Sequence, residues 1–311
     1  MNKKTAIILA TYNGWSMTQD CLSDLASLPQ EDFIISVADN ASTDDTVENI
    51  RKQFPHVKVY PKKENFGAGS GNNAAVQGLK DDGIKFDFVC LLNNDTRLDS
   101  AVIVELRDSL IEAQTRFCEK AIVVPTVLNN DGTPQHNYYT RITPIQFFLN
   151  AFRKESTAAR YLEGTPKQCP GTSFYETYWA SAVCWMMTAD LYDTLGGFDK
   201  KIFMYYEDWD LAHRALKIGA RFYIQSKCSI THLGGGSAKS KLSRALQHDN
   251  SQQYVFKKHY GFRGFILSKS FRFCRSLVRI VKTLPHSIGS QNKENREYIK
   301  HHLTLMKAAL W

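Results

Sequence analysis

Short apolar runs alternate with amphipathic segments along the first 125 residues of the chain. Five of these runs are rich in β-branched or aromatic residues, which is typical of buried strands: "TAIILA", "FIISVAD", "VKVY", "FDFVCLL" and "AIVVP". Between them, apolar residues recur with helical spacing over 16–28, over 44–54, after a glycine-rich turn at 64–75, and from 99 onward. Strands that alternate with helices predict an α/β fold, in which a mixed, mostly parallel sheet is flanked by helices.

The second half of the chain is less regular. Glycine, proline and aromatic residues are mixed over 129–177, which predicts long loops or a lid. A helix is expected to begin at the acids of "YYEDWDLAHRALKIGA" and to end near Gly219.

A basic amphipathic helix is predicted over 264–284, as part of a C-terminal helical extension. Its apolar side would carry Ile266, Phe273, Leu277, Ile280, Val281 and Leu284. Its basic side would carry Lys269, Arg272, Arg275, Arg279 and Lys282. Two interpretations stay open: the helix binds an anionic membrane surface, or its apolar side packs on the rest of the chain or on a second subunit.

The net charge of +8 is concentrated near the end of the chain. Nine Lys or Arg residues and no Asp or Glu lie between Asn250 and Lys293, so any basic partner surface is expected there. Nucleic-acid binding is disfavoured because no known motif or aromatic stacking module accompanies this charge. The seven cysteines are scattered without a CxxC pair, which favours a reducing cytosol. No window approaches the roughly 20 apolar residues of a membrane span.

Polar residues follow three of the predicted strands at the point where each strand ends: "TYN" at 11–13, "DNAS" at 39–42 and "NNDT" at 93–96. Ligands of such sheets bind beyond the carboxyl ends of the strands. Capping does not explain a carboxylate as close to a buried strand end as Asp39, whereas the imide N–H of a nucleotide base would use it. Asp44 is better explained as part of a helix start.

The glycine-rich segment "ENFGAGSGNNAA" is either a simple loop or a turn that presents helix amides to a diphosphate. Asp95, in "NNDTRLD", can hold a divalent cation together with phosphate oxygens and water, or can form an Asx turn. The acids of "YYEDWDLAHR" either complement the helix dipole or supply a general base. His232, before three glycines, is either structural or a metal ligand.

Taken together and in this order, these segments resemble the inverting family-2 glycosyltransferases of GT-A fold, most of all their bacterial rhamnosyltransferase-like branch. The resemblance covers roughly residues 4–260 and includes "LGGFDKKIFMYYEDWDLAHRALKIGA" and "THLGGGS". It implies a catalytic domain at 1–260 and a basic amphipathic helical extension at 261–311.

The resemblance also assigns roles to single residues. Asp208 would be the catalytic base, with Glu207 beside it, and Asp95 and His232 would hold Mg²⁺ or Mn²⁺ as the cofactor. Asp39 would accept the N3–H of the base. The other nucleotide-binding residues would be Thr11, Tyr12, Asn13, Asn65, Gly67, Asn72, Asn73 and Asn94. The acceptor-binding residues would be Trp209 and Trp179.

One departure from the family pattern has a consequence for the metal. Asn93 and Asn94 stand where many relatives carry acids, so metal binding to the empty enzyme should be weak. The metal is therefore expected to arrive mainly with the nucleotide diphosphate.

The expected activity is transfer of a sugar, best rhamnose from dTDP-rhamnose, to a hydroxyl of a growing cell-surface glycan or a polyprenyl-linked oligosaccharide. The alternative within the fold is a UDP-hexose or UDP-N-acetylhexosamine donor, because uracil and thymine share the imide. A non-catalytic nucleotide-sugar-binding protein is the alternative from another class, and the intact "EDWD" argues against it. The expected location is the cytoplasm, peripheral at the inner face of the bacterial plasma membrane, with a homo-oligomer left open.

Overall fold

The computed structural model describes residues 3–141, 143, 145–146, 165–234, 241–283 and 293–310. The strands are β1 (Thr5–Thr11), β2 (Phe33–Asp39), β3 (Lys58–Pro61), β4 (Phe88–Leu92), β5 (Thr96–Arg97), β6 (Ala121–Leu128), β7 (Tyr138–Tyr139), β8 (Lys167–Gln168), β9 (Phe174–Thr177), β10 (Trp179–Ala180), β11 (Cys184–Thr188) and β12 (Arg221–His232). The helices are α1 (Trp15–Leu25), α2 (Thr46–Gln53), α3 (Ala68–Asp81), α4 (Ala101–Arg116), α7 (Ala189–Leu195), α8 (Glu207–Lys217), α9 (Lys241–Thr283) and α10 (Lys293–Leu310).

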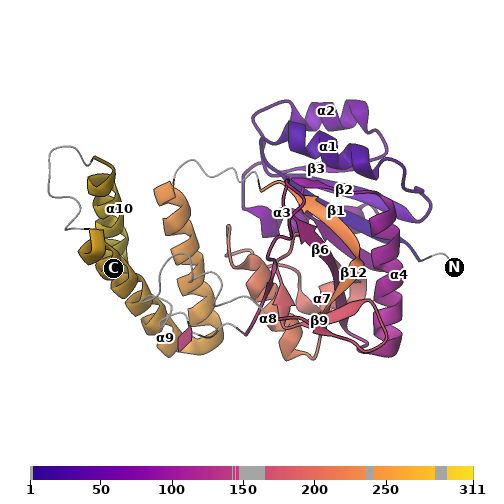
Figure 1. The fold of residues 1–311 in the computed structure, drawn as a ribbon. Helices are drawn as coiled ribbons and strands as arrows, with labels where there is room; N and C mark the ends of the chain where they lie inside the picture. Colours follow the sequence, from indigo (N-terminus) through magenta and orange to yellow (C-terminus); the bar gives the residue numbers. More distant parts are fainter. Residues whose placement is uncertain are drawn as a thin grey trace. The chain divides into compact units, whose positions relative to one another are not determined.

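The chain divides into two compact units, one of 1–140 with 164–237 and one of 141–163 with 238–311. The first unit contains the α/β region drawn from indigo to orange in Figure 1. The second contains α9 and α10. The expected domain boundary at 260/261 falls inside α9, where Gly261 has a non-helical conformation (φ 64°, ψ −155°).

A mixed sheet forms the centre of the first unit, in the order β3-β2-β1-β4-β11-β6-β12-β9-β8, with β5 paired to β12. Strands β1 to β4 are mutually parallel, and β12 is parallel to β6. Strand β11 enters antiparallel between β4 and β6. The mixed, mostly parallel sheet predicted from the alternation of strands and helices is therefore confirmed.

Helices cover both faces of this sheet (Figure 1) because alternate strand residues point to opposite sides. On one face, Ile7 and Leu9 of β1 pack in the same core as residues of α1, α2 and α4, including Leu22, Ile50 and Leu106. On the other face, α3 lies against β1 and β2. Since β1, β2 and β4 run in parallel, their polar carboxyl ends meet at one edge.

The glycines of α3 are required by close packing. A Cβ at Gly71 would lie 2.7 Å from Ala10 Cβ, and one at Gly69 would lie 2.9 Å from Phe198 Cβ. Gly67, with φ 87°, would place a Cβ only 1.6 Å from the Phe203 carbonyl oxygen. The glycine-rich turn thus allows α3 to approach both the sheet and the segment that precedes α8.

The region expected to be long loops contains short strands where the structure describes it. After β6 the chain turns in a hairpin, with a bridge between Leu128 and Pro134. Strand β7 then pairs with β10, while β8 and β9 extend the main sheet beyond β12. Residues 147–164 of this region lie outside the described part of the chain.

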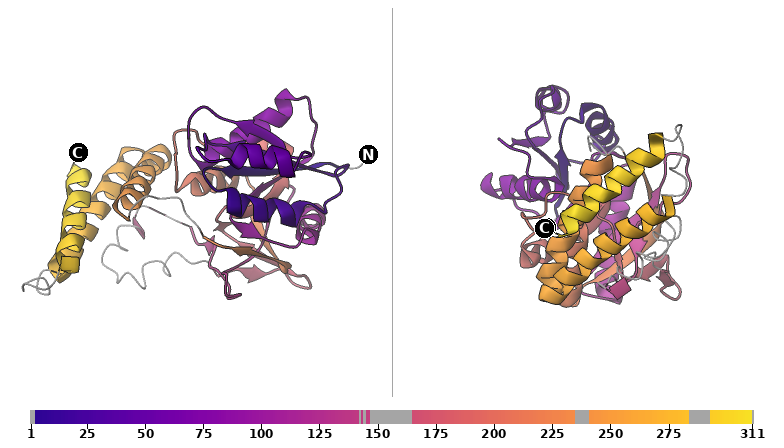
Figure 2. Two further views of the ribbon diagram at one scale, coloured as in Figure 1. Left: turned by 90° about the horizontal axis from the view of Figure 1, so that it is seen from above. Right: turned by 90° about the vertical axis from the view of Figure 1, so that its left-hand side faces the viewer.

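The second unit is a set of packed helices (Figure 2). Its contacts show that the predicted basic side of the helix over 264–284 is not uniformly directed to solvent. Asp249, in the first half of α9, pairs with Arg272 Nε at 3.2 Å and with Arg275 Nη2 at 3.1 Å in the second half. Arg272 is buried, so two of the five basic residues point toward another helical segment. The charge pattern alone could not reveal this because the partner acid lies outside the projected segment.

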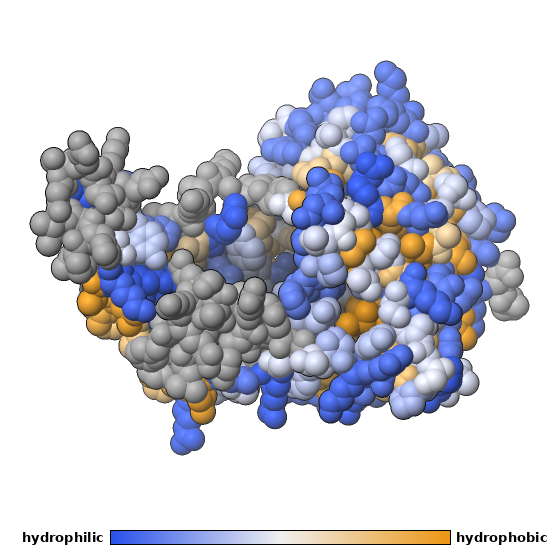
Figure 3. All heavy atoms as spheres, viewed as in Figure 1, coloured by the Kyte–Doolittle hydropathy of each residue, from blue (hydrophilic) through white to orange (hydrophobic). Residues whose placement is uncertain are grey.

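Half of the apolar side predicted for this helix is exposed. Ile266, Leu277 and Val281 are exposed, Phe273 and Ile280 are half-buried, and Leu284 lies outside the described residues. Phe262, which follows Gly261 in α9, is also exposed. Hydrophobic residues appear on the later part of α9 in the space-filling view (Figure 3). None of the described helices has a stretch long and apolar enough to cross a membrane.

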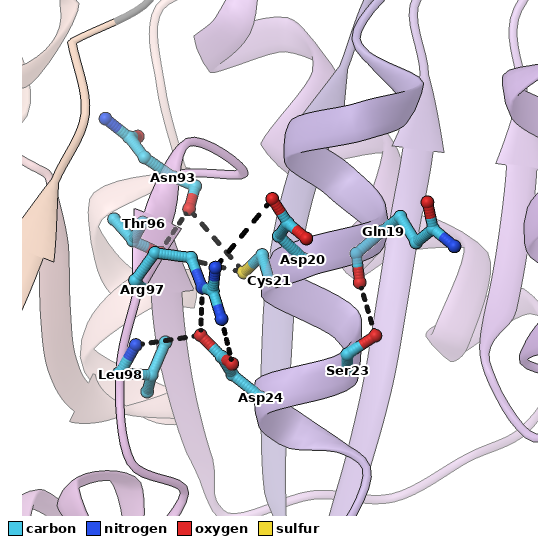
Figure 4. Close-up of polar contacts among 9 residues, drawn as sticks. All are labelled: Gln19, Asp20, Cys21, Ser23, Asp24, Asn93, Thr96, Arg97 and Leu98. Atoms are coloured by element: carbon cyan, nitrogen blue, oxygen red, sulfur yellow. Dashed lines mark hydrogen bonds and ion pairs between the residues drawn. The ribbon is translucent and has the colours of Figure 1, made fainter.

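The turn between β4 and β5 is fastened to α1 (Figure 4). Arg97 donates to both carboxylate oxygens of Asp24, at 2.7 and 3.0 Å, and the Leu98 amide donates to the same carboxylate at 3.0 Å. Thr96 Oγ1 donates to the Asn93 carbonyl at 2.7 Å. The side-chain amide of Asn93 points away from α1 (Figure 4).

We expect Asp24→Ala to lower the free energy of unfolding by about 1.5–3 kcal/mol, because it removes three hydrogen bonds that involve a charged group. Asp20→Ala is the matched control on the same helix: Asp20 is half-exposed and lies 3.8 Å from Arg97, so its loss should cost no more than about 0.5 kcal/mol. Urea unfolding of both variants measures the difference, and equal effects would contradict the anchoring role of Asp24.

Candidate functional site

A cavity of about 470 Å³ opens in the first unit, beyond the end of β4. Its walls come from segments that are far apart in the sequence: Ala68, Gly69, Asn72, Asn93, Gln135, His136, Tyr139, Ser181, Ala182, Val183, Phe198, Glu207, Asp208 and His232. Five of the residues that the motifs singled out therefore share one cavity, namely Asn72, Asn93, Glu207, Asp208 and His232.

Glu207 and Asp208 form a buried carboxyl pair at the start of α8. The two preceding residues, Tyr205 and Tyr206, both have left-handed backbone conformations, with φ of 66° and 67°. This conformation costs non-glycine residues about 1–2 kcal/mol each, and it turns the chain sharply into the helix. The strained turn brings both acids to the cavity wall.

The two carboxyl groups differ in their hydrogen bonds. Asp208 accepts from the Trp209 amide at 2.7 Å and from the Ala182 amide at 3.4 Å. Glu207 Oε2 is buried and has no hydrogen-bond partner among the described residues. Burial, reinforced by the negative charge of Asp208, raises the pKa of Glu207 to about 8. Burial also raises the pKa of Asp208, while the backbone amides oppose the shift. Glu207 therefore keeps its proton near neutral pH, while the two backbone amides favour the charged form of Asp208.

The third acid of the motif has a different function. Asp210 is fully buried and binds Arg214 Nε at 2.9 Å. Arg214 in turn donates to the carbonyls of Leu195 and Gly197. Asp210 thus joins α8 to the end of α7 and takes no part in the cavity.

Asp95 and His232 stand side by side because β5 pairs with the end of β12, with His232 opposite Thr96. His232 Nε2 lies 3.3 Å from Asp95 Oδ1. The described residues contain no cluster of three or more His, Cys, Asp or Glu side chains suited to a metal. A carboxylate and an imidazole so close together still fit a divalent ion that takes its other ligands from phosphate and water.

The residues expected around the nucleotide base gather at the ends of β1 and β2, where Thr11 is paired in register with Asp39. The Asn13 side chain accepts from the Thr43 amide at 2.7 Å. Asp39 accepts from the amide of Ser42 at 2.9 Å and also from its hydroxyl. These bonds lie within the loop between β2 and α2, and the N-cap residue of α2 is Asp45, so Asp39 does not cap that helix. Asp44 accepts from Thr46 at the start of α2, which agrees with its expected part in a helix start.

The structure separates the candidate asparagines. Asn72 and Asn93 line the cavity, and Asn72 Oδ1 is buried without a hydrogen-bond partner among the described residues. Asn73 instead uses its whole amide on Phe198 and Tyr192, at 2.7–2.8 Å. Asn94 donates to Thr18 and Thr11 at 2.9 and 3.3 Å, and Asn65 accepts from the Gly67 amide.

Neither tryptophan assigned to the acceptor is among the residues that line the cavity. Trp209 is 3% exposed and stacks on His213, with ring centroids 4.9 Å apart. Trp179 stacks behind Tyr139, with centroids 4.5 Å apart, and it is Tyr139 that lines the cavity. The resemblance suggested the tryptophans, but their burial leaves little side-chain surface for direct contact with a ligand.

Five further residues that line the cavity were not predicted from the sequence. They come from the hairpin after β6, from β7, from the segment before β11 and from the turn after α7, and they are Gln135, His136, Tyr139, Ser181 and Phe198. The run "PQHNYY" does hold polar and aromatic residues within an irregular region, which was a signal of a ligand site. Its pairing with the end of β6 and with β10 could not be read from the sequence.

We expect the free energy of unfolding to fall as pH rises from about 5 to 8. The folded state holds the Glu207 proton up to a pKa of about 8, whereas the unfolded state releases it near 4.5. The unfolded state therefore binds fewer protons in this range, which lowers stability by up to about 1.4 kcal/mol per pH unit. Glu207→Gln should flatten this slope, while Glu48→Gln, an exposed control on α2, should keep it. Urea unfolding at several pH values measures both, and an unchanged slope in Glu207→Gln would refute the buried proton.

The chain is similar to several known proteins. The chain is 24% identical over 298 residues to the N-acetylglucosaminyl-diphospho-decaprenol L-rhamnosyltransferase of Mycobacterium tuberculosis, in the CDC 1551 / Oshkosh and H37Rv strains. This match covers 88% of the chain and 94% of the relative. Among solved structures, Staphylococcus aureus TarS 1–349 matches with a TM-score of 0.54 and 13% identity, over 97% of this chain and 81% of that one.

The structural match supports the predicted GT-A fold and, at this low identity, the fold alone. The sequence match to the family is broader. The family model described as Glycosyl transferase family 2 covers residues 6–183, which is more than half of the chain and includes the strand ends, α3 and the β4–β5 turn. The chain belongs to glycosyl transferase family 2.

Proposed function

We propose that the protein transfers a sugar from a nucleoside diphosphate to an acceptor hydroxyl, with inversion at the anomeric carbon. One observation carries the proposal: a single cavity contains a buried, hydrogen-bonded carboxylate, Asp208, together with His232, the neighbour of Asp95. A displacement of this kind needs a base for the acceptor and charge stabilisation for the leaving diphosphate. The cavity offers residues for both tasks.

Asp208 is the proposed base. Its carboxylate takes the proton of the acceptor hydroxyl as the acceptor oxygen bonds to the anomeric carbon and the bond to the diphosphate breaks. The amides of Ala182 and Trp209 hold this carboxylate in place. Glu207, which carries its proton near neutral pH, offers an O–H donor from Oε2 to a sugar or acceptor hydroxyl. One positioned base is sufficient, so no enzyme nucleophile is required.

Asp95 and His232 would hold Mg²⁺ or Mn²⁺. The neighbouring side chain of Asn93 is an amide and adds no negative charge. A divalent ion there would neutralise negative charge on the departing diphosphate. Since only these two side chains are at hand among the described residues, most of the coordination would come from the diphosphate and water. This supports the expectation that metal and nucleotide bind together.

The donor we favour is dTDP-rhamnose, with a polyprenyl-linked or growing surface glycan as the acceptor. The support is the mycobacterial relative, whose name records an L-rhamnosyltransferase that acts on a decaprenol-linked sugar. A UDP-hexose or UDP-N-acetylhexosamine remains the second candidate, since Asp39 would accept the imide of either base. Release of nucleoside diphosphate from a panel of donors distinguishes the two.

Asp208→Asn should lower kcat/KM by at least about 10²-fold, because it removes the proton acceptor. The Kd of dTDP and UDP should change by less than about twofold, whereas Asp95→Ala should weaken both nucleotide binding and transfer. Asp190→Asn, an exposed acid in the first turn of α7, is the matched control and should behave as wild type. Mass spectrometry of the product and calorimetry with each nucleotide measure these effects.

Near-normal turnover by Asp208→Asn would overturn the assignment of the base. A wild-type protein that binds the donors but transfers to no lipid-linked acceptor would favour the non-catalytic alternative.

We also propose that residues 261–311 bind an anionic membrane surface, while 1–260 carry out catalysis. The observation is an exposed apolar stripe on α9, made of Phe262, Ile266, Leu277 and Val281. Basic residues accompany it, among them Lys269 and Lys282. An apolar stripe flanked by basic residues suits insertion at the boundary of anionic headgroups.

The double variant Phe262→Ser/Val281→Ser should reduce flotation of the full-length protein with phosphatidylglycerol-containing vesicles by at least about tenfold, because both side chains are exposed and apolar. Ile111→Ser, an exposed residue of α4, is the control and should float like wild type. Equal flotation of the double variant and the wild type would contradict membrane binding by the apolar stripe. Contact with a second subunit would then be the remaining explanation for its exposure.

A further inference from the structure

A line of side-chain hydrogen bonds runs through the hairpin after β6 and ends on His232. Asn129 Nδ2 contacts Thr133 Oγ1 at 3.0 Å, and Gln135 Nε2 contacts Asn129 Oδ1 at 3.0 Å. Gln135 Oε1 then lies 2.8 Å from His232 Nδ1. The hairpin that carries these residues is fixed by backbone bonds between Asn129 and Thr133 and between Gln135 and Val127. Gln135 itself lines the cavity.

The carboxylate of Asp131, which lies next to Thr133, determines the direction of every hydrogen bond in this line. Thr133 Oγ1 lies 2.6 Å from Asp131, whose ionised carboxylate can only accept, so the hydroxyl must donate to it. The Thr133 oxygen is then an acceptor for the Asn129 amide N–H. Asn129 Oδ1 in turn accepts from the Gln135 N–H, which leaves Gln135 Oε1 facing the histidine as an acceptor.

The line therefore dictates which nitrogen of neutral His232 carries the proton. An acceptor at 2.8 Å requires a donor on Nδ1, so Nε2 is left with its lone pair. That lone pair faces Asp95 Oδ1 at 3.3 Å. Two acceptor atoms at this distance repel each other unless a positive charge binds both. Histidines that bind metals usually donate their other ring N–H to a fixed acceptor, as here.

We propose that Gln135 is a positioning residue, which holds His232 as the Nδ1–H tautomer and so presents Nε2, beside Asp95, as a ligand for the cation of the donor diphosphate. The part that concerns the cation rests on the proposed function; the tautomer does not. Gln135 acts through His232 and needs no contact with the reacting atoms. Asn129, Thr133 and Asp131 fix the Gln135 amide so that it cannot turn its NH₂ toward the imidazole.

The matched pair Gln135→Leu and Gln135→Glu tests the proposal. Leucine removes the acceptor at similar size, whereas a glutamate oxygen still accepts from Nδ1. The tautomer of His232 is read from ¹⁵N-histidine NMR of the full-length protein at pH 8.5, above the usual pKa of a histidine. A His232→Gln spectrum assigns the signal.

The wild type and Gln135→Glu should show the Nδ1–H tautomer, and Gln135→Leu should shift toward Nε2–H, with the proton then donated to Asp95. Mn²⁺ affinity, measured by EPR in the presence of dTDP or UDP, should fall about 10–100-fold in Gln135→Leu and should not fall in Gln135→Glu. Gln114→Leu, on α4 outside the cavity, should alter neither quantity.

An unchanged His232 tautomer in Gln135→Leu overturns the proposal, and so does an equal loss of Mn²⁺ affinity in the leucine and glutamate variants. The NMR measurement needs neither donor nor turnover. Failure of sugar transfer by the wild type would therefore count against the proposed function without deciding the role of Gln135.

Discussion

The site depends on the antiparallel pairing of β11 with β4, beside the parallel pairing of β4 with β1. Because β4 and β11 run in opposite directions, the end of one meets the beginning of the other. The Asn93 amide donates to the Val183 carbonyl at this junction, and the neighbouring Ala182 amide donates to Asp208. A single change of strand direction thus brings the β4–β5 turn and the carboxyl pair of α8 to one cavity.

The cavity is costly to maintain. Two adjacent residues hold left-handed conformations, two carboxyl groups are withdrawn from water, and polar atoms of Glu207 and Asn72 are buried without partners among the described residues. Buried polar groups without partners usually destabilise a fold by about 1–3 kcal/mol each. The compensation lies in the apolar sheet and its helices, and a substrate can supply the missing hydrogen bonds.

Local patterns predicted the elements and the motifs that meet at the cavity, because strand alternation and helix periodicity are written in neighbouring residues. They failed wherever a distant contact decides the orientation of a side chain. Asn72 and Asn73 are adjacent in the sequence, yet only the side chain of Asn73 hydrogen-bonds to Phe198 and Tyr192, while Asn72 lines the cavity. Trp209 is buried, which no local pattern reveals. Arg272 is buried against Asp249, which lies in an earlier part of the same helix. Gln135 escaped notice because its importance comes from the pairing of β6 with β12, which aligns Leu128 with Thr231.

The close approach of α3 to the segment before α8 has a mechanical consequence. Gly67 lies against the carbonyl of Phe203, Gly69 against the ring of Phe198, and Asn73 grips the backbone of Phe198. Because these contacts are close, the first turn of α3 and the segment that precedes Glu207 and Asp208 form one rigid wall of the cavity. Changes in the shape of the cavity must then come from the other residues that line it, among which Tyr139 and His136 belong to short segments with few strand pairings. These segments can therefore change shape without disturbing the wall that carries Glu207 and Asp208.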